Sequence, residues 1–337
     1  MTRKLLFGFA LLFVAAAGVY YRFHRSTQPL EIAYAGNRQV TLWSTTAQVR
    51  EPITTASYGE RLDVLQRFQD QIRVRTKAGI TGWVAEREIL SADVWQKAAD
   101  LEKKTASMPS QARGHTKVLT NLRVDAGRDA TRLRQLNKSV PLQVYERRPV
   151  EVPTSNTAAA AEESSVEPAE AKKEDWWLVR AHTSDQDSVS GWILGRFMEL
   201  DVPQPLPDYA SSAGMRIVAW FELNKVTDSS GKPRSQYLLV GAHGPEGQPC
   251  DFSLLRVYTW GKKRERYETA YIEGGVCGKL PVNVKKPSQA GEETRFSFLD
   301  ISEGGRGAGA EREYVMHQTV VRRVKQPGEA KPHKRKR

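Results

Sequence analysis

The 337-residue chain contains few cysteines and histidines. Only two cysteines, Cys250 and Cys277, and six histidines occur in it. Two cysteines are too few for a small fold stapled by several disulfides. The chain has no Cys-x-x-Cys pair and no cluster of histidines, so we do not expect a structural zinc site. It also lacks a nucleophile elbow, a phosphate-binding glycine loop and a metal-binding triplet, so we predict neither a metal nor a cofactor.

The charge balance is basic. The chain carries 51 Lys and Arg against 39 Asp and Glu, a formal net charge of +12. Such a balance favours anionic neighbours such as lipid headgroups, acidic wall polymers or nucleic acid, but it does not choose among them. A solubilising surface with one basic tail, residues 326–337, explains it equally well. We do not expect nucleic acid, because that tail would have to lie in the cytoplasm.

The expected topology comes from the N-terminus. An uncharged apolar run from Leu5 to Tyr21 stands between basic residues. At ~1.5 Å rise per residue it would be roughly 26 Å long as a helix, near the lower limit for spanning a bilayer. We therefore expect residues 1–25 to form a single-pass anchor in the plasma or inner membrane. The body of the protein would then lie in the periplasm or outside the cell. The alanines at 15–17 leave open a cleaved signal peptide and a secreted protein.

An internal repeat organises the next half of the chain. Several apolar positions recur after 80 residues, namely Leu42 and Leu122, Ile53 and Leu133, Leu62 and Leu142, and Val64 and Val144. After a length difference the match resumes, with Ile72-Arg73-Val74-Arg75 against Trp177-Leu178-Val179-Arg180. Gly82-Trp83-Val84 likewise matches Gly191-Trp192-Ile193. A repeat of this size predicts two small domains of one kind.

Turn residues and short alternating runs predict a mainly β protein. We expect one small barrel over 26–90, a helical linker over 91–113 and a second barrel over 114–203. The second barrel would contain an acidic, disordered insertion at 149–174. A Pro-rich linker at 204–213 would lead to an antiparallel β domain at 214–325, followed by the disordered basic tail.

The repeats resemble the bacterial SH3-domain family. Asn121-Leu122-Arg123-Val124-Asp125-Ala126-Gly127-Arg128 is similar to the first strand and turn of these domains. The runs Leu142-Gln143-Val144, Trp177-Leu178-Val179 and Gly191-Trp192-Ile193 follow in the family's order. The first repeat departs from the pattern at Leu42-Trp43-Ser44-Thr45, which puts a shared ligand groove in doubt. The resemblance implies small barrels that bind cell-wall peptides or position a neighbouring domain outside the cytoplasm. It brings no catalytic residues.

Four aromatic residues are candidate ligand contacts. Trp83 and Trp192 follow glycines and either cover the barrel core or form the wall of a shallow groove. Trp177 matches Ile72 and should point inward, so its neighbour Trp176 should point outward, where it could anchor a ligand. Packing beneath the insertion is the alternative for Trp176, and packing is also the simpler interpretation for Tyr145.

The two cysteines lie symmetrically about a predicted hairpin turn at Gly261-Lys262-Lys263. In that register Trp260 faces Tyr267 and the two sulfurs meet at the open end, so we predict a disulfide between Cys250 and Cys277. A nucleophilic cysteine would need a basic partner such as His243 or His317, and nothing in the sequence brings them together.

Three functions fit these observations. The first is a membrane-anchored, non-catalytic envelope protein whose tandem SH3-like domains bind cell-wall peptide (peptidoglycan) or a protein partner. The second is an envelope hydrolase with its site in residues 214–325 and the barrels as targeting modules. The third is a structural spacer without a ligand.

Overall fold

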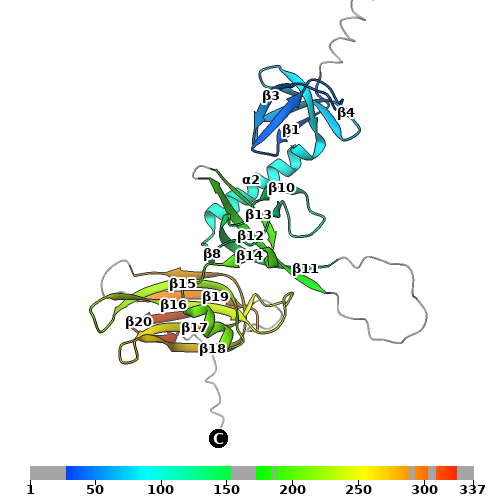
Figure 1. The fold of residues 1–337 in the computed structure, drawn as a ribbon. Helices are drawn as coiled ribbons and strands as arrows, with labels where there is room; N and C mark the ends of the chain where they lie inside the picture. Colours follow the sequence, from blue (N-terminus) through cyan, green and yellow to red (C-terminus); the bar gives the residue numbers. More distant parts are fainter. Residues whose placement is uncertain (1–27, 153–171, 185–186, 288–292, 303–308, 325–337) are drawn as a thin grey trace, which may run out of the picture. The chain divides into compact units, whose positions relative to one another are not determined.

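The computed structural model describes residues 28–152, 172–184, 187–287, 293–302 and 309–324 (Figure 1). The protein is mainly β, with three antiparallel sheets of seven strands each and, among the described residues, two α-helices. The chain divides into two compact units, residues 1–100 and 101–337, and each is described by itself.

The expected membrane-spanning helix is corrected here. Within the described ranges, no helix has both the length and the apolar character needed to cross a bilayer. Residues 1–25, where the anchor was predicted, lie outside the described residues, as does the basic tail at 326–337. The fold class of the described residues is mainly β.

The first unit contains the first sheet, drawn in blue to cyan in Figure 1. Its strand order is β3-β2-β6-β5-β4-β1-β7. The alternating residues Leu62 and Val64 of β4 and Ile72 and Val74 of β5 lie in one buried core. The elements are β1 (Glu31–Ala35), β2 (Gln39–Trp43), β3 (Pro52–Ser57), β4 (Arg61–Phe68), β5 (Gln71–Thr76), β6 (Thr81–Ala85), a 3₁₀ turn (Glu86–Glu88) and β7 (Ile89–Ser91).

The second sheet has the same strand order, β10-β9-β13-β12-β11-β8-β14, and the same 3₁₀ turn before its last strand. The two halves of the repeat therefore share one topology, although their assignment to the SH3 family remains a prediction. The elements are β8 (Ala112–Thr116), β9 (Thr120–Arg123), β10 (Arg132–Leu136), β11 (Pro141–Glu151), β12 (Lys173–Ser184), β13 (Asp187–Leu194), a 3₁₀ turn (Gly195–Phe197) and β14 (Met198–Leu200).

The matched glycines Gly82 and Gly191 lie in equally tight surroundings in the two sheets. A Cβ on Gly82 would lie 2.8 Å from the Cβ of Leu42, and a Cβ on Gly191 would lie 2.7 Å from the Cγ of Leu122. Leu42 and Leu122 are both fully buried. The glycine before each tryptophan thus lets two strands approach closely over a buried leucine.

The matched pair Ile53 and Leu133 differs between the copies. Ile53 is 46% exposed, whereas Leu133 is 2% exposed. Leu133 lies at a register shift between Arg132 and Arg134, which places adjacent residues of β10 in buried positions. The first copy has the same register shift, because Leu42 pairs with Thr54 and Trp43 with Pro52. Both copies therefore have a bulge at the matched residue, and they differ in how deeply that residue is buried.

Helix α2 (Ala92–Ser107) lies within the segment predicted to be helical. In the first unit its Trp95 ring stacks on Tyr34 at 4.9 Å, and a Cβ on Gly59 would lie 2.5 Å from that ring. In the second unit Thr105 is buried, and its hydroxyl lies 2.8 Å from that of Ser190 on β13.

The insertion in the second repeat is shorter than the expected 149–174. Strand β11 continues to Glu151 and β12 begins at Lys173, and the backbone N–H of Val152 still donates to Lys172 at 2.8 Å. Residues 153–171 lie outside the described residues. The segment 204–213, predicted as a linker, contains helix α3 (Leu206–Ser212), whose first turn accommodates Pro207.

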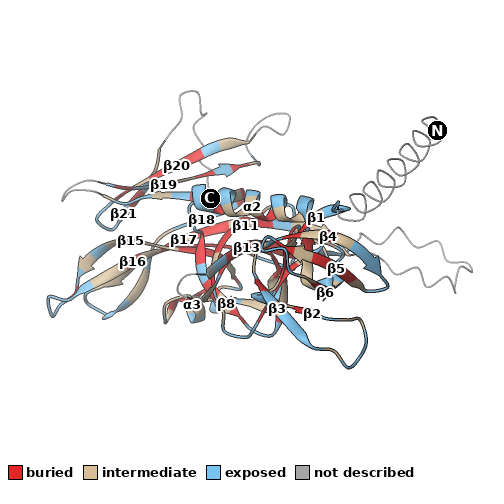
Figure 2. Ribbon diagram, turned by 90° about the horizontal axis from the view of Figure 1, so that it is seen from above, coloured by how far each residue is buried: buried red, intermediate tan, exposed pale blue. Residues whose placement is uncertain are grey.

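The third sheet is a meander in which each strand pairs with the next along the chain. Alternation along β19 puts Phe296 and Phe298 in the core, where both rings stack with Tyr314. Figure 2 shows such buried residues in red along the strands. The strands are β15 (Arg216–Thr227), β16 (Pro233–Ala242), β17 (Phe252–Gly261), β18 (Arg266–Lys285), β19 (Thr294–Asp300), β20 (Ala310–His317) and β21 (Val320–Arg323).

A buried ionic group lies within the third sheet. Asp300 forms an ion pair with Arg312 at 2.6 Å, and it accepts hydrogen bonds from the Cys277 N–H and from Ser302. Burial alone would raise the pKa of Asp300. The hydrogen bonds from Ser302 and Cys277, together with the charge of Arg312, outweigh that effect, and the pKa lies below its ordinary value.

Candidate binding cleft

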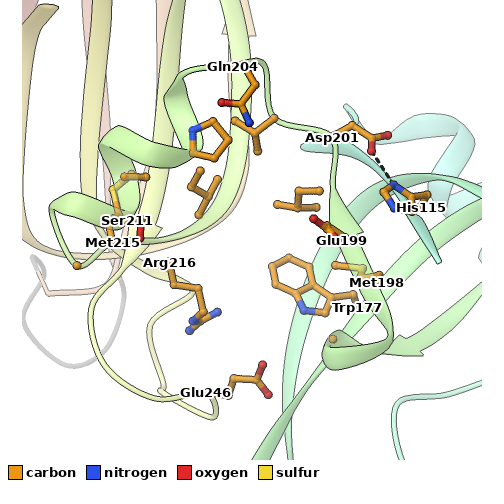
Figure 3. Close-up of a pocket in the computed structure, with 17 residues that line it drawn as sticks. His115, Trp177, Met198, Glu199, Asp201, Gln204, Ser211, Met215, Arg216 and Glu246 are labelled. Carbon is orange, nitrogen blue, oxygen red and sulfur yellow. Dashed lines mark hydrogen bonds and ion pairs between the residues drawn. The ribbon is translucent and has the colours of Figure 1, made fainter. Parts of the chain in front are cut away.

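A cleft of about 680 Å³ lies between the second and third sheets, within the second unit. The second sheet supplies His115, Trp177 and strand β14, while α3, the start of β15 and the loop at Glu246 supply the other wall (Figure 3). The segment that joins the two sheets, Asp201 to Gln204, lines one end. Clefts at the junction of two folded parts are common ligand sites.

The walls of the cleft are held together by a buried arginine. Arg147 on β11 is fully buried and forms ion pairs with Asp175 at 2.6 Å and with Asp251 at 3.1 Å. Its guanidinium also donates to the carbonyl oxygens of Gln248 and Cys250. A planar guanidinium with several donors can bind partners on both sheets at once, so this residue fixes the loop 243–251 against β12.

Gln111 makes a second connection between the sheets. Its side-chain Oε1 accepts from the Val282 N–H at 2.7 Å, and its Nε2 lies 3.3 Å from the Val282 carbonyl oxygen. The Trp220 N–H donates to the Gln111 carbonyl oxygen at 3.2 Å. Because Gln111 is fully buried, these bonds replace water and fix the orientation of the walls.

The charged residues that line the cleft are mostly acidic. Three carboxylates, Glu199, Asp201 and Glu246, face one arginine, Arg216. Asp201 also lies 2.7 Å from the Nδ1 of His115. In Figure 3, Arg216 and Glu246 lie toward one end of the cleft and the His115–Asp201 pair toward the other. The cleft therefore favours cationic groups, although the whole chain is basic.

Arg216 has hydrogen-bonding capacity that the described protein atoms do not use. One nitrogen lies 3.5 Å from Asp175, while Nε and Nη2 are buried without a hydrogen-bond partner among the described residues. The side chain as a whole is 31% exposed and lines the cleft, where its positive charge can attract an acceptor from a ligand. The apolar surface beside it comes from Trp177, Met198 and Met215.

The predicted aromatic residues do not converge on this cleft. Tyr145, Trp176 and Trp192 are each at most 3% exposed and pack together with Leu178 and Leu194. The expectation that Trp176 points outward into solvent is wrong, because Leu101 of α2 and other apolar side chains cover that face of the sheet. The sequence feature that could have indicated this burial is the amphipathic helix α2, whose apolar residue Leu101 packs against this cluster.

The two tryptophans that follow glycines differ in burial. Trp192 packs in a buried core cluster, as one of its two interpretations predicted. Strand alternation puts Trp192 on the other face of β13 from its neighbours Gly191 and Ile193, and this face packs against Leu101 of α2. The Arg148 guanidinium lies 4.2 Å from the Trp192 ring centroid. Trp83 stays partly exposed, and its ring meets Phe68 edge-on at 6.5 Å. Only Trp83, of the four candidates, keeps a surface that a ligand can reach.

The predicted disulfide between Cys250 and Cys277 is confirmed. Trp260 faces Tyr267 across the hairpin, as expected. The register shifts between Phe252 and Leu254, and Gly275 has a φ of 73° there, yet the cysteine Cα atoms remain 4.9 Å apart. Neither sulfur is a free thiol in this state.

Metal-ligating side chains do not cluster in the described ranges, where no group of three or more His, Cys, Asp or Glu could hold an ion. His243, one possible partner for a reactive cysteine, instead has its Nδ1 2.9 Å from the Gly214 carbonyl oxygen.

Comparisons with known proteins give no family. The chain matches no known protein family, and no curated protein matches its sequence. Among solved structures, an NlpC/P60 family protein from Bacillus cereus is 10% identical, covering 72% of this chain and 94% of its own, with a TM-score of 0.21. NlpC2 from Trichomonas vaginalis is 8% identical, covering 89% of this chain and 99% of its own, with a TM-score of 0.17. NlpC1 from the same organism is 7% identical, covering 85% of this chain and 88% of its own, with a TM-score of 0.18. TM-scores this low carry no argument about fold or function.

The residues of the cleft were missed by sequence reasoning. Arg216, Glu199 and Glu246 are single charged residues in separate segments, without a motif that connects them. The prolines at 203, 205 and 207 were the one useful signal, because they mark the junction beside which the cleft lies.

Proposed function

We propose that this chain is a non-catalytic protein of the cell envelope that binds a short peptide with a free amino group. The peptide would lie in the cleft between the second and third sheets. The observation that carries this proposal is the negative charge of the cleft. Three carboxylates face one arginine there, in a chain with a net charge of +12. An ammonium group would lie against Glu199 and Asp201, and a peptide carbonyl or carboxylate against Arg216.

Two further features support this proposal. The Cys250–Cys277 disulfide suits an oxidising compartment outside the cytoplasm. The resemblance of the repeats to bacterial SH3 domains suggests cell-wall peptides as the source of the ligand. A protein partner that presents an amino-terminal segment or a lysine side chain would satisfy the same chemistry.

The experiment is calorimetric titration of the full chain with a synthetic tetrapeptide that contains lysine and a free carboxylate. The same peptide with acetylated amines is the matched ligand. We expect acetylation, or the double variant Glu199→Gln/Asp201→Asn, to weaken binding about tenfold, or about 1.4 kcal/mol. The control variant Glu51→Gln/Asp93→Asn removes two exposed acids of the first unit and should bind normally.

Two results would overturn the proposal. Equal binding of the free and acetylated peptides would show that the acidic residues do not select an amine. Release of cleavage products from the peptide or from purified wall material by the wild-type chain would show that the protein is a hydrolase.

A further inference from the structure

A second cleft, of about 690 Å³, lies against the third sheet. It is formed by α3, by strand β17 and by the turn and first residues of β18. It shares no lining residue with the peptide cleft described above. Its chemistry can therefore be considered independently.

The charged residues of this second cleft are mostly cationic. Arg256, Lys263, Arg264 and Arg266 line it, against a single carboxylate, Glu268. Glu268 forms an ion pair with Arg264 at 3.5 Å, so three cations have no carboxylate among the lining residues. The concentration of positive charge in one concave place attracts an anion more strongly than the same charges spread over a surface.

Arg256 is oriented within this cleft. It comes from β17, where its Nη1 donates to the Tyr258 hydroxyl at 3.3 Å. Its Nε is buried and has no hydrogen-bond partner among the described residues. The contact with Tyr258 holds the guanidinium in a fixed place on the cleft wall, and its planar, charged head suits the paired oxygens of a phosphate group.

Hydroxyl groups complete the lining. Tyr209 and Ser212 come from α3, and Tyr258 and Tyr267 come from the hairpin. Burial, with the neighbouring Tyr237, raises the pKa of Tyr267 to about 12, so its hydroxyl keeps its proton at neutral pH. Neutral hydroxyls can donate to an anion without adding negative charge of their own.

We propose that this cleft binds the phosphate group of an anionic ligand, with Arg256 and Arg266 as its main contacts. The phosphate could belong to a small soluble ester or to a lipid headgroup, and the chemistry of recognition is the same. Solvated cations at a hairpin turn are the simple alternative, and they would bind phosphate no better than other exposed basic residues.

The experiment uses the full chain and two kinds of probe. Pyrophosphate and glycerol phosphate are titrated by calorimetry, and vesicles of phosphatidylglycerol, with phosphatidylcholine vesicles for comparison, are tested by cosedimentation. Binding of the soluble probes identifies a free phosphate compound as the ligand, whereas binding only to phosphatidylglycerol identifies a headgroup. We expect Arg256→Gln/Arg266→Gln to weaken binding at least tenfold and Arg256→Lys to recover part of it.

The control is Lys225→Gln/Arg322→Gln, which removes the same charge from exposed positions of the third sheet outside the cleft. Thermal melts of each variant establish that it is folded. An equal loss in the control variant would assign the binding to overall charge and overturn the proposal. So would unchanged binding in Arg256→Gln/Arg266→Gln, or the failure of every probe to bind at millimolar concentration.

Discussion

Arg147 of the second sheet donates a hydrogen bond at 3.1 Å to Asp251, the residue before strand β17 of the third sheet, across 104 positions of sequence. The same guanidinium binds Asp175 on β12 at 2.6 Å. One buried cation thus satisfies two buried carboxylates from different parts of the fold. The peptide cleft depends on this arrangement, because the loop 243–251 that supplies Glu246 is attached to the second sheet through Arg147.

Arg147→Gln should therefore destabilise the protein strongly. It removes the nearest cation from two buried carboxylates, so that, among the described residues, Asp175 keeps only Arg216 at 3.5 Å and Asp251 keeps only Lys279 at 3.3 Å. Breaking a buried pair in this way costs about 3–5 kcal/mol. Arg148→Gln is the matched control, since the neighbouring side chain is 44% exposed, pairs with the exposed Asp125 and otherwise lies over the Trp192 ring. Loss of such a surface pair costs about 1 kcal/mol or less. Urea unfolding of both variants measures the difference, and equal losses would show that the buried network contributes little.

The repeat was predictable because its residues are fixed by local packing. Leu62 and Val64 are buried at alternate positions of β4, and Leu142 and Val144 at the matching positions of β11, so the period of two is visible in the sequence. The disulfide was predictable because the two cysteines lie near the open end of one hairpin, and they remain close although the register shifts along it.

The remaining features depend on contacts between distant segments. Trp176 and Trp177 are both buried because β12 is covered on both faces, and strand alternation cannot reveal the second layer. Arg147 looks like any other charged residue near the end of a strand. Only the fold brings Asp175 and Asp251 to it, and only the fold brings Arg216 opposite Glu199 in the cleft.

The matched glycines give a test of the shared packing. Gly191→Ala would place a methyl group 2.7 Å from the Leu122 Cγ and 2.8 Å from the Arg123 carbonyl oxygen. Overpacking of this kind costs about 1–3 kcal/mol. Gly82→Ala should behave alike, since its Cβ would meet Leu42 at 2.8 Å.

Gly274→Ala is the control for these variants. A Cβ at this position would lie 3.6 Å from the Leu254 side chain, an ordinary van der Waals distance. The free energy of unfolding of this variant should therefore stay within about 0.5 kcal/mol of the wild type. The measurement is the midpoint of thermal unfolding. If Gly191→Ala melts no lower than Gly274→Ala, close approach of the strands is not the reason for the glycine before each tryptophan.

Asp300 predicts how stability depends on pH. Its pKa in the folded protein is lowered, so the unfolded chain binds the proton more readily as the pH falls. The stability contributed by this carboxylate is therefore fully present above its ordinary pKa, about 4, and is lost as the pH falls below that value. Asp300→Asn should lower the free energy of unfolding at pH 7 by about 1–3 kcal/mol, because Arg312 then loses a buried anionic partner.

The variant should also lose less stability than the wild type between pH 5 and pH 2, because the titrating group is gone. Urea unfolding at a series of pH values gives both quantities. Asp70→Asn, which removes an exposed carboxylate of the first unit, controls for the change in net charge. A variant curve that runs parallel to the wild type over this range would mean that the titration of Asp300 is not linked to unfolding. The acid sensitivity would then have to come from other carboxylates, of which Asp228, held by Ser230, Lys232 and Arg234, is the next to test.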